Sequence, residues 1–278
     1  HEGGDTSHHF SLDVGLVLRQ FENFLEHKNI LSFPEYPVIR LYKYILPFSG
    51  KKAISGKNKK MNNLFGVIVS IIFIGMIIVS AKVFEKAGKE ASRKYIHIML
   101  SNWWVIAMIF FDNMIWAAFV PALFVVINYL SYKKGFIKVM ERDSNDQNKE
   151  SLGTVYYALS LFILAIITFG PLNNPAIGLC GILVMGYGDG LAAVIGQAVN
   201  TRKFKIKGNT KSIAGCVSMF CVTLIIFAAF LTYSNAEFVA IKSILIAILM
   251  TIIEAVSIKG TDNITVPIIT SLLALLMI

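Results

Sequence analysis

Long apolar runs constrain this chain more than any other feature of its sequence. A helix needs about 20 mostly apolar residues to cross a bilayer, and runs of this kind recur from residue 63 to the end. They cover 63–81, 95–111, 114–131, 153–170, 175–197, 212–232, 238–256 and 264–278. Because several are short or interrupted, we expect an all-α, polytopic integral membrane protein with seven or eight transmembrane helices.

The composition supports a membrane protein and argues against nucleic-acid binding. Only 15% of the residues are charged and 55% are apolar, whereas a soluble domain carries roughly 25% charged residues. The net charge of +9 comes from Lys and Arg clusters between the apolar runs, and the sequence contains no nucleic-acid-binding module. We therefore expect the bilayer, and not nucleic acid, to be the partner of these basic residues. The sequence gives no indication of the oligomeric state.

The charge of the loops predicts how the spans are oriented. Three loops contain five Lys or Arg residues each, and three others contain none; the basic loops are 82–94, 132–152 and 198–211, and the others are 112–113, 171–174 and 233–237. With eight spans the two kinds alternate, so the positive-inside rule places the basic loops in the cytoplasm. We also expect Trp103, Trp104 and Trp116 to anchor their spans at the membrane interface.

Residues 1–60 do not fit this pattern. They are polar and end in a run of lysines that the rule would leave on the outer side. We therefore expect 61–278 to be the membrane-embedded catalytic domain and 1–60 to be an extension that is either non-native or accessory. The alternative is a native soluble tail whose lysines hold the first span in the opposite orientation.

Three carboxylates in the apolar half are candidates for function. Asp189 lies in the sequence GYGDG, between Gly188 and Gly190, while Glu254 and Asp262 bracket the inner end of the seventh span. Charged groups inside membrane proteins usually face a cavity or a partner and mark functional sites. The topology places all three carboxylates at a similar depth on the cytoplasmic side. The alternative is that each one forms a separate ion pair or a helix cap.

Lys211, Ser212 and Gly215 belong to a short motif, KSIAG, at the predicted start of the sixth span. Unpaired backbone N–H groups and the helix dipole favour a phosphate at such a position, and a lysine adds a point charge for it. The upstream glycines of a P-loop are absent, so the motif alone is weak support for nucleotide binding.

A second basic group contains Arg93, Lys94 and His97, at the inner start of the second span. His97 follows the two cations by four and three residues and therefore lies on the same helical face. These residues either mark the inner boundary of the span or contact phosphates. Asn263 follows Asp262 directly before the last span, where an acid–amide pair serves either as a ligand or as a helix cap.

The candidate residues together predict metal-dependent phosphoryl transfer. Oxygen ligands from Asp189, Asp262 and Asn263, with Glu254 as a further candidate, suit Mg²⁺, which usually takes one or two carboxylates plus substrate phosphates. Phosphoryl transfer requires positioning, a metal and cations more than covalent chemistry by the protein. Because no Lys or Arg lies within ten residues of Asp189, we expect its positive partner to be this metal ion and not a side chain.

The chain resembles the polyprenol kinases, a family that comprises phytol and farnesol kinases, dolichol kinase and the bacterial CTP-dependent diacylglycerol/polyprenol kinases. The similar segments are, in order, RKYIHI (93–98), GTVYY (153–157), GDGLA (188–192), KSIAG (211–215) and DNITVP (262–267). The phytol kinase branch is the most similar, through GTVYY, KSIAG and DNITVP. No single segment is specific, but their shared order along the chain is.

This resemblance implies transfer of the γ-phosphate of CTP, or of another nucleoside triphosphate, to the hydroxyl of a membrane lipid alcohol such as phytol, farnesol or diacylglycerol. The catalytic candidates are Asp189, Lys211, Glu254 and Asp262, with Asp189 and Asp262 as metal ligands. Candidates for nucleotide or phosphate binding are Arg93, Lys94, His97, Gly188, Gly190, Ser212, Gly215 and Asn263. Either Asp262 or Glu254 would position or deprotonate the attacking hydroxyl.

Three other functions compete with this prediction. The related CTP:phosphatidate cytidylyltransferases share the membrane site, but their longer acidic–basic signature near the C-terminal end is absent here. A membrane transporter would also contain intramembrane acids, but its charged groups would gather at mid-depth and not on one side. A non-catalytic membrane subunit is the third alternative, and it predicts that Asp189→Asn leaves all activity intact.

Overall fold

The computed structural model describes residues 56–134, 152–206, 209–258 and 260–278, which belong to one compact unit, Ser55–Ile278. Residues 1–55 of the predicted extension and most of the predicted loop 132–152 lie outside the described residues. The proposed boundary at residue 61 therefore stays a prediction.

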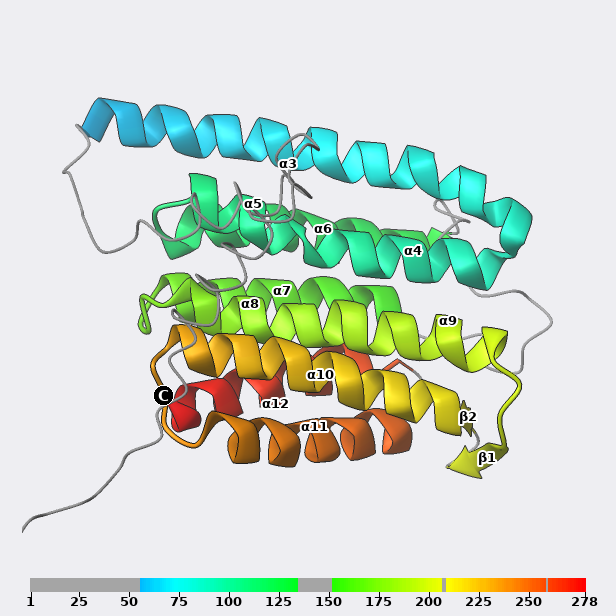
Figure 1. Ribbon diagram of the computed structural model, residues 1–278. Helices are drawn as coiled ribbons and strands as arrows, with labels where there is room; N and C mark the ends of the chain where they lie inside the picture. The colour runs from blue at the N-terminus through cyan, green and yellow to red at the C-terminus, as the bar shows by residue number, and fades with distance from the viewer. Residues whose placement is uncertain (1–55, 135–151, 207–208, 259) are drawn as a thin grey trace, which may run out of the picture. The chain divides into compact units, whose positions relative to one another are not determined.

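The described chain is an antiparallel bundle of helices (Figure 1). Its elements are α3 (Gly56–Phe84), η1 (Glu85–Ala87), α4 (Lys89–Ser101), α5 (Trp103–Phe110), α6 (Met114–Lys134), α7 (Gly153–Phe169), α8 (Pro175–Leu183), η3 (Val184–Asp189), α9 (Gly190–Ala198), α10 (Ile213–Tyr233), α11 (Val239–Val256) and α12 (Asp262–Met277). Each predicted span corresponds to one helix or to consecutive helical segments, which confirms the all-α class.

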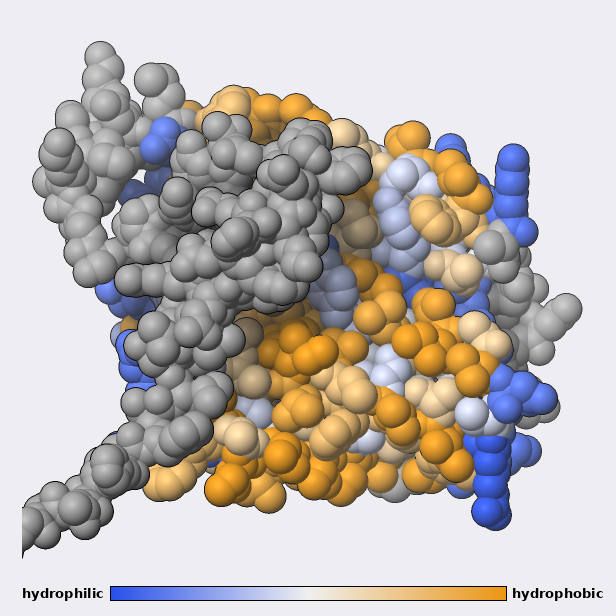
Figure 2. Space-filling view, in the orientation of Figure 1, coloured by the Kyte–Doolittle hydropathy of each residue, from blue (hydrophilic) through white to orange (hydrophobic). Residues whose placement is uncertain are grey.

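Five of these helical stretches are long and apolar enough to cross a membrane by themselves. They are Asn62–Phe84, Met114–Lys133, Pro175–Ala198, Ile213–Tyr233 and Val239–Val256, and α7 and α12 are shorter apolar helices. Apolar side chains cover the middle of the visible face, and hydrophilic residues lie toward the ends of the bundle (Figure 2). This distribution is the one expected for a protein surrounded by lipid.

The turn between α5 and α6 shows why the spans end where they do. The Asn113 side chain caps α6, because its Oδ1 accepts hydrogen bonds from the backbone N–H groups of Ile115 and Trp116 at 3.0 and 3.2 Å. Asp112 is bound to Asn63 of α3 through both a side-chain and a backbone hydrogen bond. This polar turn therefore also fixes the adjacent end of α3.

The prediction for two of the tryptophans is wrong. Trp103 and Trp104 are 2% and 0% exposed and belong to the core of the bundle, not to its interface with the membrane. The Trp104 indole N–H donates to the Pro175 carbonyl at 2.9 Å, and a Cβ added at Gly178 would overlap the Trp104 ring. A glycine on α8 thus leaves the space that the large side chain fills.

A β-hairpin that the sequence did not predict joins α9 to α10. Strands β1 (Lys203–Ile206) and β2 (Asn209–Ser212) are antiparallel, with Phe204 opposite Lys211. Side chains alternate between the two faces of a strand. Accordingly, Lys203 and Lys205 are exposed while Phe204 and Ile206 are half-buried. Lys211 shares the inward face with Phe204, and the hairpin thereby directs one lysine of a basic loop toward the helices.

Candidate active site

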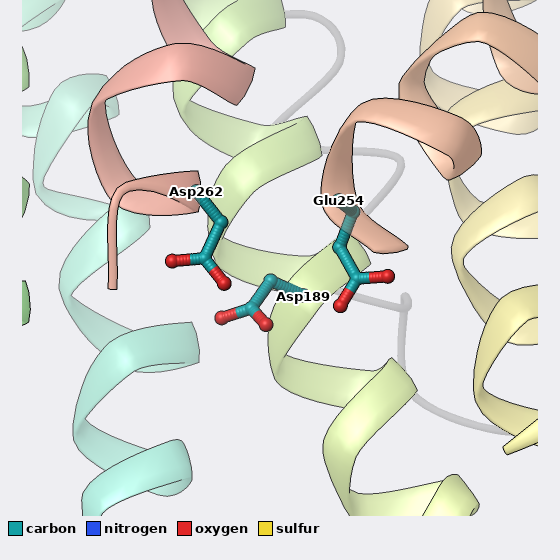
Figure 3. A group of neighbouring side chains, drawn as sticks. All are labelled: Asp189, Glu254 and Asp262. Carbon is teal, nitrogen blue, oxygen red and sulfur yellow. The ribbon is translucent and has the colours of Figure 1, made fainter. Parts of the chain in front are cut away.

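Three carboxylates from different elements converge at one end of the bundle (Figure 3). Asp189 ends η3, Glu254 lies in the last turn of α11 and Asp262 begins α12. One carboxylate oxygen from each lies within 4.8 Å of the others. Asp189 and Glu254 are buried and Asp262 is half-buried. The three acids that the topology predicts at a similar depth thus lie side by side, and such a group requires nearby positive charge.

The positive partner of Asp189 is a lysine side chain, whereas the sequence led us to expect a metal ion in this role. The Lys94 ammonium lies 2.6 Å from Asp189 Oδ2. His97 Nε2 lies 3.3 Å from the same oxygen and 3.2 Å from the Met185 carbonyl oxygen. Lys94 and His97 are 6% and 7% exposed. The sequence around Asp189 could not indicate this partner, because it comes from α4.

Glu254 has its own lysine. Lys211 of the hairpin forms an ion pair and a hydrogen bond with the Glu254 carboxylate. Burial lowers the pKa of Lys211, but the charge and hydrogen bond of Glu254, together with the charges of Asp189 and Asp262, raise it by more, so the net pKa lies above the ordinary lysine value. Lys211 therefore stays protonated at neutral pH. The structure thus brings the lysine of the KSIAG motif into contact with one of the three candidate acids.

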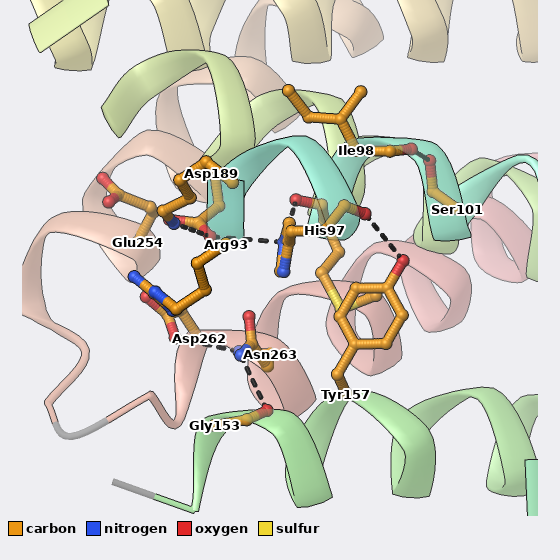
Figure 4. A network of polar contacts seen from close by, with 12 residues as sticks. Arg93, His97, Ile98, Ser101, Gly153, Tyr157, Asp189, Glu254, Asp262 and Asn263 are labelled. Carbon is orange, nitrogen blue, oxygen red and sulfur yellow. Dashed lines mark hydrogen bonds and ion pairs between the residues drawn. The ribbon is translucent and has the colours of Figure 1, made fainter. Parts of the chain in front are cut away.

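Arg93 lies at the edge of the same cluster (Figure 4). Its Nε donates to Glu90 at 3.0 Å within α4. Burial lowers the pKa of Arg93, but Glu90, and more weakly Asp189 and Asp262, raise it above the ordinary arginine value. The guanidinium is thus paired with Glu90 within its own helix and interacts electrostatically with Asp189 and Asp262 of the cluster.

Asn263 connects the starts of α12 and α7. Its Nδ2 donates to the Gly153 carbonyl at 2.8 Å, and its backbone N–H donates to Asp262 Oδ1 at 3.0 Å. The other amide atom, Oδ1, is buried and accepts no hydrogen bond from the part of the chain that the structure describes. An unsatisfied buried acceptor costs about 1–3 kcal/mol, so this oxygen is a candidate to bind a ligand.

The helix start at Ser212 does not offer the predicted phosphate site. The N–H groups of Ile213, Ala214 and Gly215 already donate to the Arg202 carbonyl, to Thr201 Oγ1 and to Ser212 Oγ, at 3.2, 3.1 and 3.1 Å. Ser212 is therefore an ordinary N-cap. Since the first three donors are occupied, a phosphate would have to displace them.

The glycines near Asp189 serve helix packing. A Cβ at Gly188 would lie 2.6 Å from the Met219 sulfur, one at Gly190 would overlap Ile98, and one at Gly215 would lie 2.8 Å from the Ala192 carbonyl oxygen. Real Cβ atoms essentially never approach other atoms under 3.0 Å. The predicted role of these glycines in phosphate binding is thus not supported, because neighbouring helices fill the space.

Two features of the site were not predicted. The segment η3 is a π-helix inserted between α8 and α9, and π-turns inside α-helices are frequent at functional sites. Tyr157, from the segment GTVYY, donates its hydroxyl hydrogen to the His97 carbonyl at 3.0 Å, and its ring packs edge-on against the His97 imidazole (Figure 4). Tyr157 therefore positions His97, and only the GTVYY segment itself pointed to it.

Fold and site together define a class of protein: a polytopic membrane protein with a charged, largely buried site of carboxylates and lysines at one end of its helices. Comparison of the sequence with those of known proteins identifies the family. The chain is 29% identical over 213 residues to the phytol kinase of Synechocystis sp.. The matched region covers 73% of this chain and 87% of that protein.

It is also 30% identical over 206 residues to phytol kinase 1, chloroplastic, of Arabidopsis thaliana, with 68% of this chain and 66% of that protein covered. The probable chloroplastic phytol kinase of Triticum aestivum is 26% identical over 207 residues, 68% of each chain. The chain belongs to the polyprenol/phytol kinase family. No protein-family model and no solved structure matches it.

Proposed function

We propose that the chain is a lipid-alcohol kinase that transfers the γ-phosphate of CTP, or of another nucleoside triphosphate, to the hydroxyl of a polyprenol-type alcohol. The observation that carries the proposal is the convergence of Asp189, Glu254 and Asp262 with Lys94 and Lys211 in a relative of the phytol kinases. CTP comes from the family resemblance alone, and phytol is the first acceptor to test.

The donor set fits Mg²⁺. Carboxylate oxygens within 4.8 Å of one another are the hard ligands that this ion binds, usually through one or two carboxylates and the substrate phosphates. Asp189 and Asp262 would hold it, with Glu254 as a third ligand. When bound, the ion would neutralise part of the negative charge on the triphosphate.

The cations of the site would hold the phosphates. Lys94, Lys211 and Arg93 donate charge-assisted hydrogen bonds, which are stronger than those between neutral groups. Their burial excludes competing water, so each contact is worth more than at an exposed surface. Their role would be to align the γ-phosphorus with the incoming hydroxyl and to stabilise the departing nucleoside diphosphate.

Asp262 is better placed than Glu254 to act on the acceptor. Within the described residues Asp262 forms no ion pair with a lysine, whereas Glu254 is bound to Lys211. Asp262 would orient the hydroxyl and receive its proton while the alcohol oxygen bonds to the γ-phosphorus. The bond from that phosphorus to the bridging oxygen breaks, and the nucleoside diphosphate leaves.

The location of the site suits a lipid acceptor and a water-soluble donor. The apolar middle of the bundle would keep the alcohol's tail in the bilayer while its hydroxyl reaches the carboxylates. Exposed cations lie on the segments that adjoin the site, namely Lys82, Lys86, Arg202, Lys203 and Lys205. By the positive-inside rule, this end of the bundle would face the cytoplasm.

The test uses purified protein in lipid nanodiscs, γ-labelled CTP or ATP, and a panel of phytol, farnesol, undecaprenol and diacylglycerol. We expect labelled lipid phosphate from the wild type and a loss on the order of 100-fold or more in Asp189→Asn, as for removal of a group that stabilises transition-state charge. The matched control is Asp112→Asn, an exposed acid in the α5–α6 turn, which should retain full activity.

Two results would contradict the proposal. Equal labelling by wild type and Asp189→Asn would exclude the site. Release of pyrophosphate from CTP and phosphatidate, with no labelled alcohol, would identify a cytidylyltransferase instead. Chromatography of the nucleotide products separates a nucleoside diphosphate from pyrophosphate.

A further inference from the structure

Both lysines of the site are already bound to carboxylates that a metal would need. Lys94 of α4 contacts Asp189 of η3 at 2.6 Å, and Lys211 of β2 contacts Glu254 of α11. The side chains of Lys94 and Asp189 are each 7% exposed, and those of Lys211 and Glu254 are 18% and 4% exposed. Each of the two ion pairs thus joins two different elements, α4 with η3 and β2 with α11.

These pairs oppose the binding of either ligand alone. A phosphate that drew Lys94 away would leave the Asp189 carboxylate buried without a cation, and a metal that captured Asp189 would leave the Lys94 ammonium buried without an anion. Removing one partner from a buried ion pair is strongly destabilising because the remaining charge has lost its compensation. The same holds for Lys211 and Glu254.

The cluster also contains a buried hydrogen-bond acceptor, Asn263 Oδ1, that is unsatisfied within the described residues. Asn263 is 5% exposed, and its Oδ1 has no hydrogen bond within the described residues. In Figure 4 the side chain lies beside Asp262 and its oxygen is directed toward the His97 side of the cluster. This oxygen is independent of both ion pairs, and it indicates that the cluster faces a ligand and is not merely a closed network of charges.

We infer, resting on the proposed function, that metal and nucleotide load this site by a paired exchange of ions. Lys94 and Lys211 leave Asp189 and Glu254 for phosphate oxygens, and the carboxylates that they release bind the divalent metal. Every buried charge then keeps an opposite partner before and after loading. The two ligands are therefore coupled: each binds weakly alone and strengthens the binding of the other by the same factor.

The experiment measures binding and not turnover. Full-length protein in nanodiscs is titrated with Mn²⁺, followed by electron paramagnetic resonance, with and without a β,γ-methylene nucleoside triphosphate that cannot donate its phosphate. We expect the analogue to lower the Kd of Mn²⁺ in the site by about tenfold, within the range usual for coupled sites. The Kd of the analogue, measured with and without Mn²⁺, should fall by the same factor.

Variants give the exchange a signature that a structural role would not produce. Lys94→Met should tighten Mn²⁺ binding in the absence of nucleotide, because Asp189 then lacks its lysine partner, and should weaken binding of the analogue. Lys211→Met should shift both constants in the same two directions through Glu254. Lys86→Met, an exposed lysine just before α4, is the matched control and should change neither constant.

The inference is overturned if the wild type binds metal and analogue independently, if neither binds, or if both lysine variants weaken both ligands alike. Thermal unfolding of each variant separates such a common loss from misfolding, and a folded variant with weaker metal binding counts against the exchange. Coupled binding without phosphorylation of any alcohol would instead leave the exchange standing and refute the proposed acceptor.

Discussion

The amide of Asn263 uses its two polar atoms in different ways. Nδ2 ties α12 to the first residue of α7 through the Gly153 carbonyl, while Oδ1 is buried without a partner in the described part of the chain. Asn128 of α6 offers a natural comparison, because its Nδ2 donates to the neighbouring Thr154 carbonyl at 3.1 Å. The same first turn of α7 is thus held by two buried asparagines, of which only Asn263 adjoins the acids.

We therefore expect Asn263→Ala and Asn128→Ala to lower the free energy of unfolding by similar amounts, about 0.5–1.5 kcal/mol, since each removes one side-chain hydrogen bond to a carbonyl of the first turn of α7. Only Asn263→Ala should also reduce phosphorylation of the alcohol per folded molecule. Detergent-titrated unfolding and labelled-lipid assays on the same preparations make the comparison. Equal retention of activity by both variants would show that Asn263 has only a structural role.

The sequence indicated which charged residues gather in one cluster more successfully than how they are paired. The acids were identified because burying a charge in an apolar segment is costly, and this argument needs no knowledge of the partner. The Lys94–Asp189 contact joins residues 95 positions apart, and only the fold brings them together. The glycines were assigned to phosphate binding because a sequence does not show which helix will pack against them.

Among the helical elements, the α5–α8 contact depends on one small residue. A Cβ at Gly178 would overlap the Trp104 ring, whereas a Cβ at Gly75 of α3 would have no heavy atom within 4 Å apart from its chain neighbours and its own helix backbone. Overpacking a filled core typically costs about 1–3 kcal/mol. The two glycines are therefore a matched pair on different helices.

We expect Gly178→Ala to destabilise the protein by about 1–3 kcal/mol, while Gly75→Ala is neutral or slightly stabilising because alanine favours a helix. Combining Gly178→Ala with Trp104→Phe should cost less than the sum of the two single changes, because the smaller ring makes room. Unfolding in graded denaturing detergent gives all four values. Additive costs would mean that the ring and the glycine do not share this space.

Hydropathy predicted the ends of the membrane-spanning helices wherever an apolar run stops at a polar residue. The predicted spans 114–131 and 153–170 correspond to α6 (Met114–Lys134) and α7 (Gly153–Phe169). The π-turn of η3 was hidden because it lies inside the continuous apolar run 175–197, and only its hydrogen-bond pattern differs from that of an α-helix. The hairpin was hidden because its lysines were explained by topology, and four-residue strands leave little periodic signal.

The bundle as a whole predicts which segments share one side of the membrane. Lys86 precedes α4, Lys203 lies in the hairpin, and both adjoin the site, whereas Glu237 lies in the connection between α10 and α11 at the opposite end. All three side chains are exposed. Their accessibility therefore tests the predicted orientation of the whole molecule.

Single-cysteine variants at these positions, made in a background without Cys180, Cys216 and Cys221, should react with a membrane-impermeant maleimide from opposite sides. We expect Lys86→Cys and Lys203→Cys to react only in inverted vesicles and Glu237→Cys only in intact cells, because basic loops face the cytoplasm. Reaction of Lys86→Cys and Lys203→Cys from different sides would contradict the bundle. Reversal of all three would contradict the orientation alone.

The position of the carboxylates at the end of an apolar bundle has a kinetic consequence for such an enzyme. Its two reactants would reach the site by different routes. The nucleotide would diffuse in three dimensions through the aqueous solution, and the alcohol would diffuse in two dimensions within the bilayer. The quantity that governs saturation by the alcohol is then its mole fraction among the surrounding lipids. Diluting the vesicles in buffer would leave that fraction unchanged, whereas adding inert lipid would lower it.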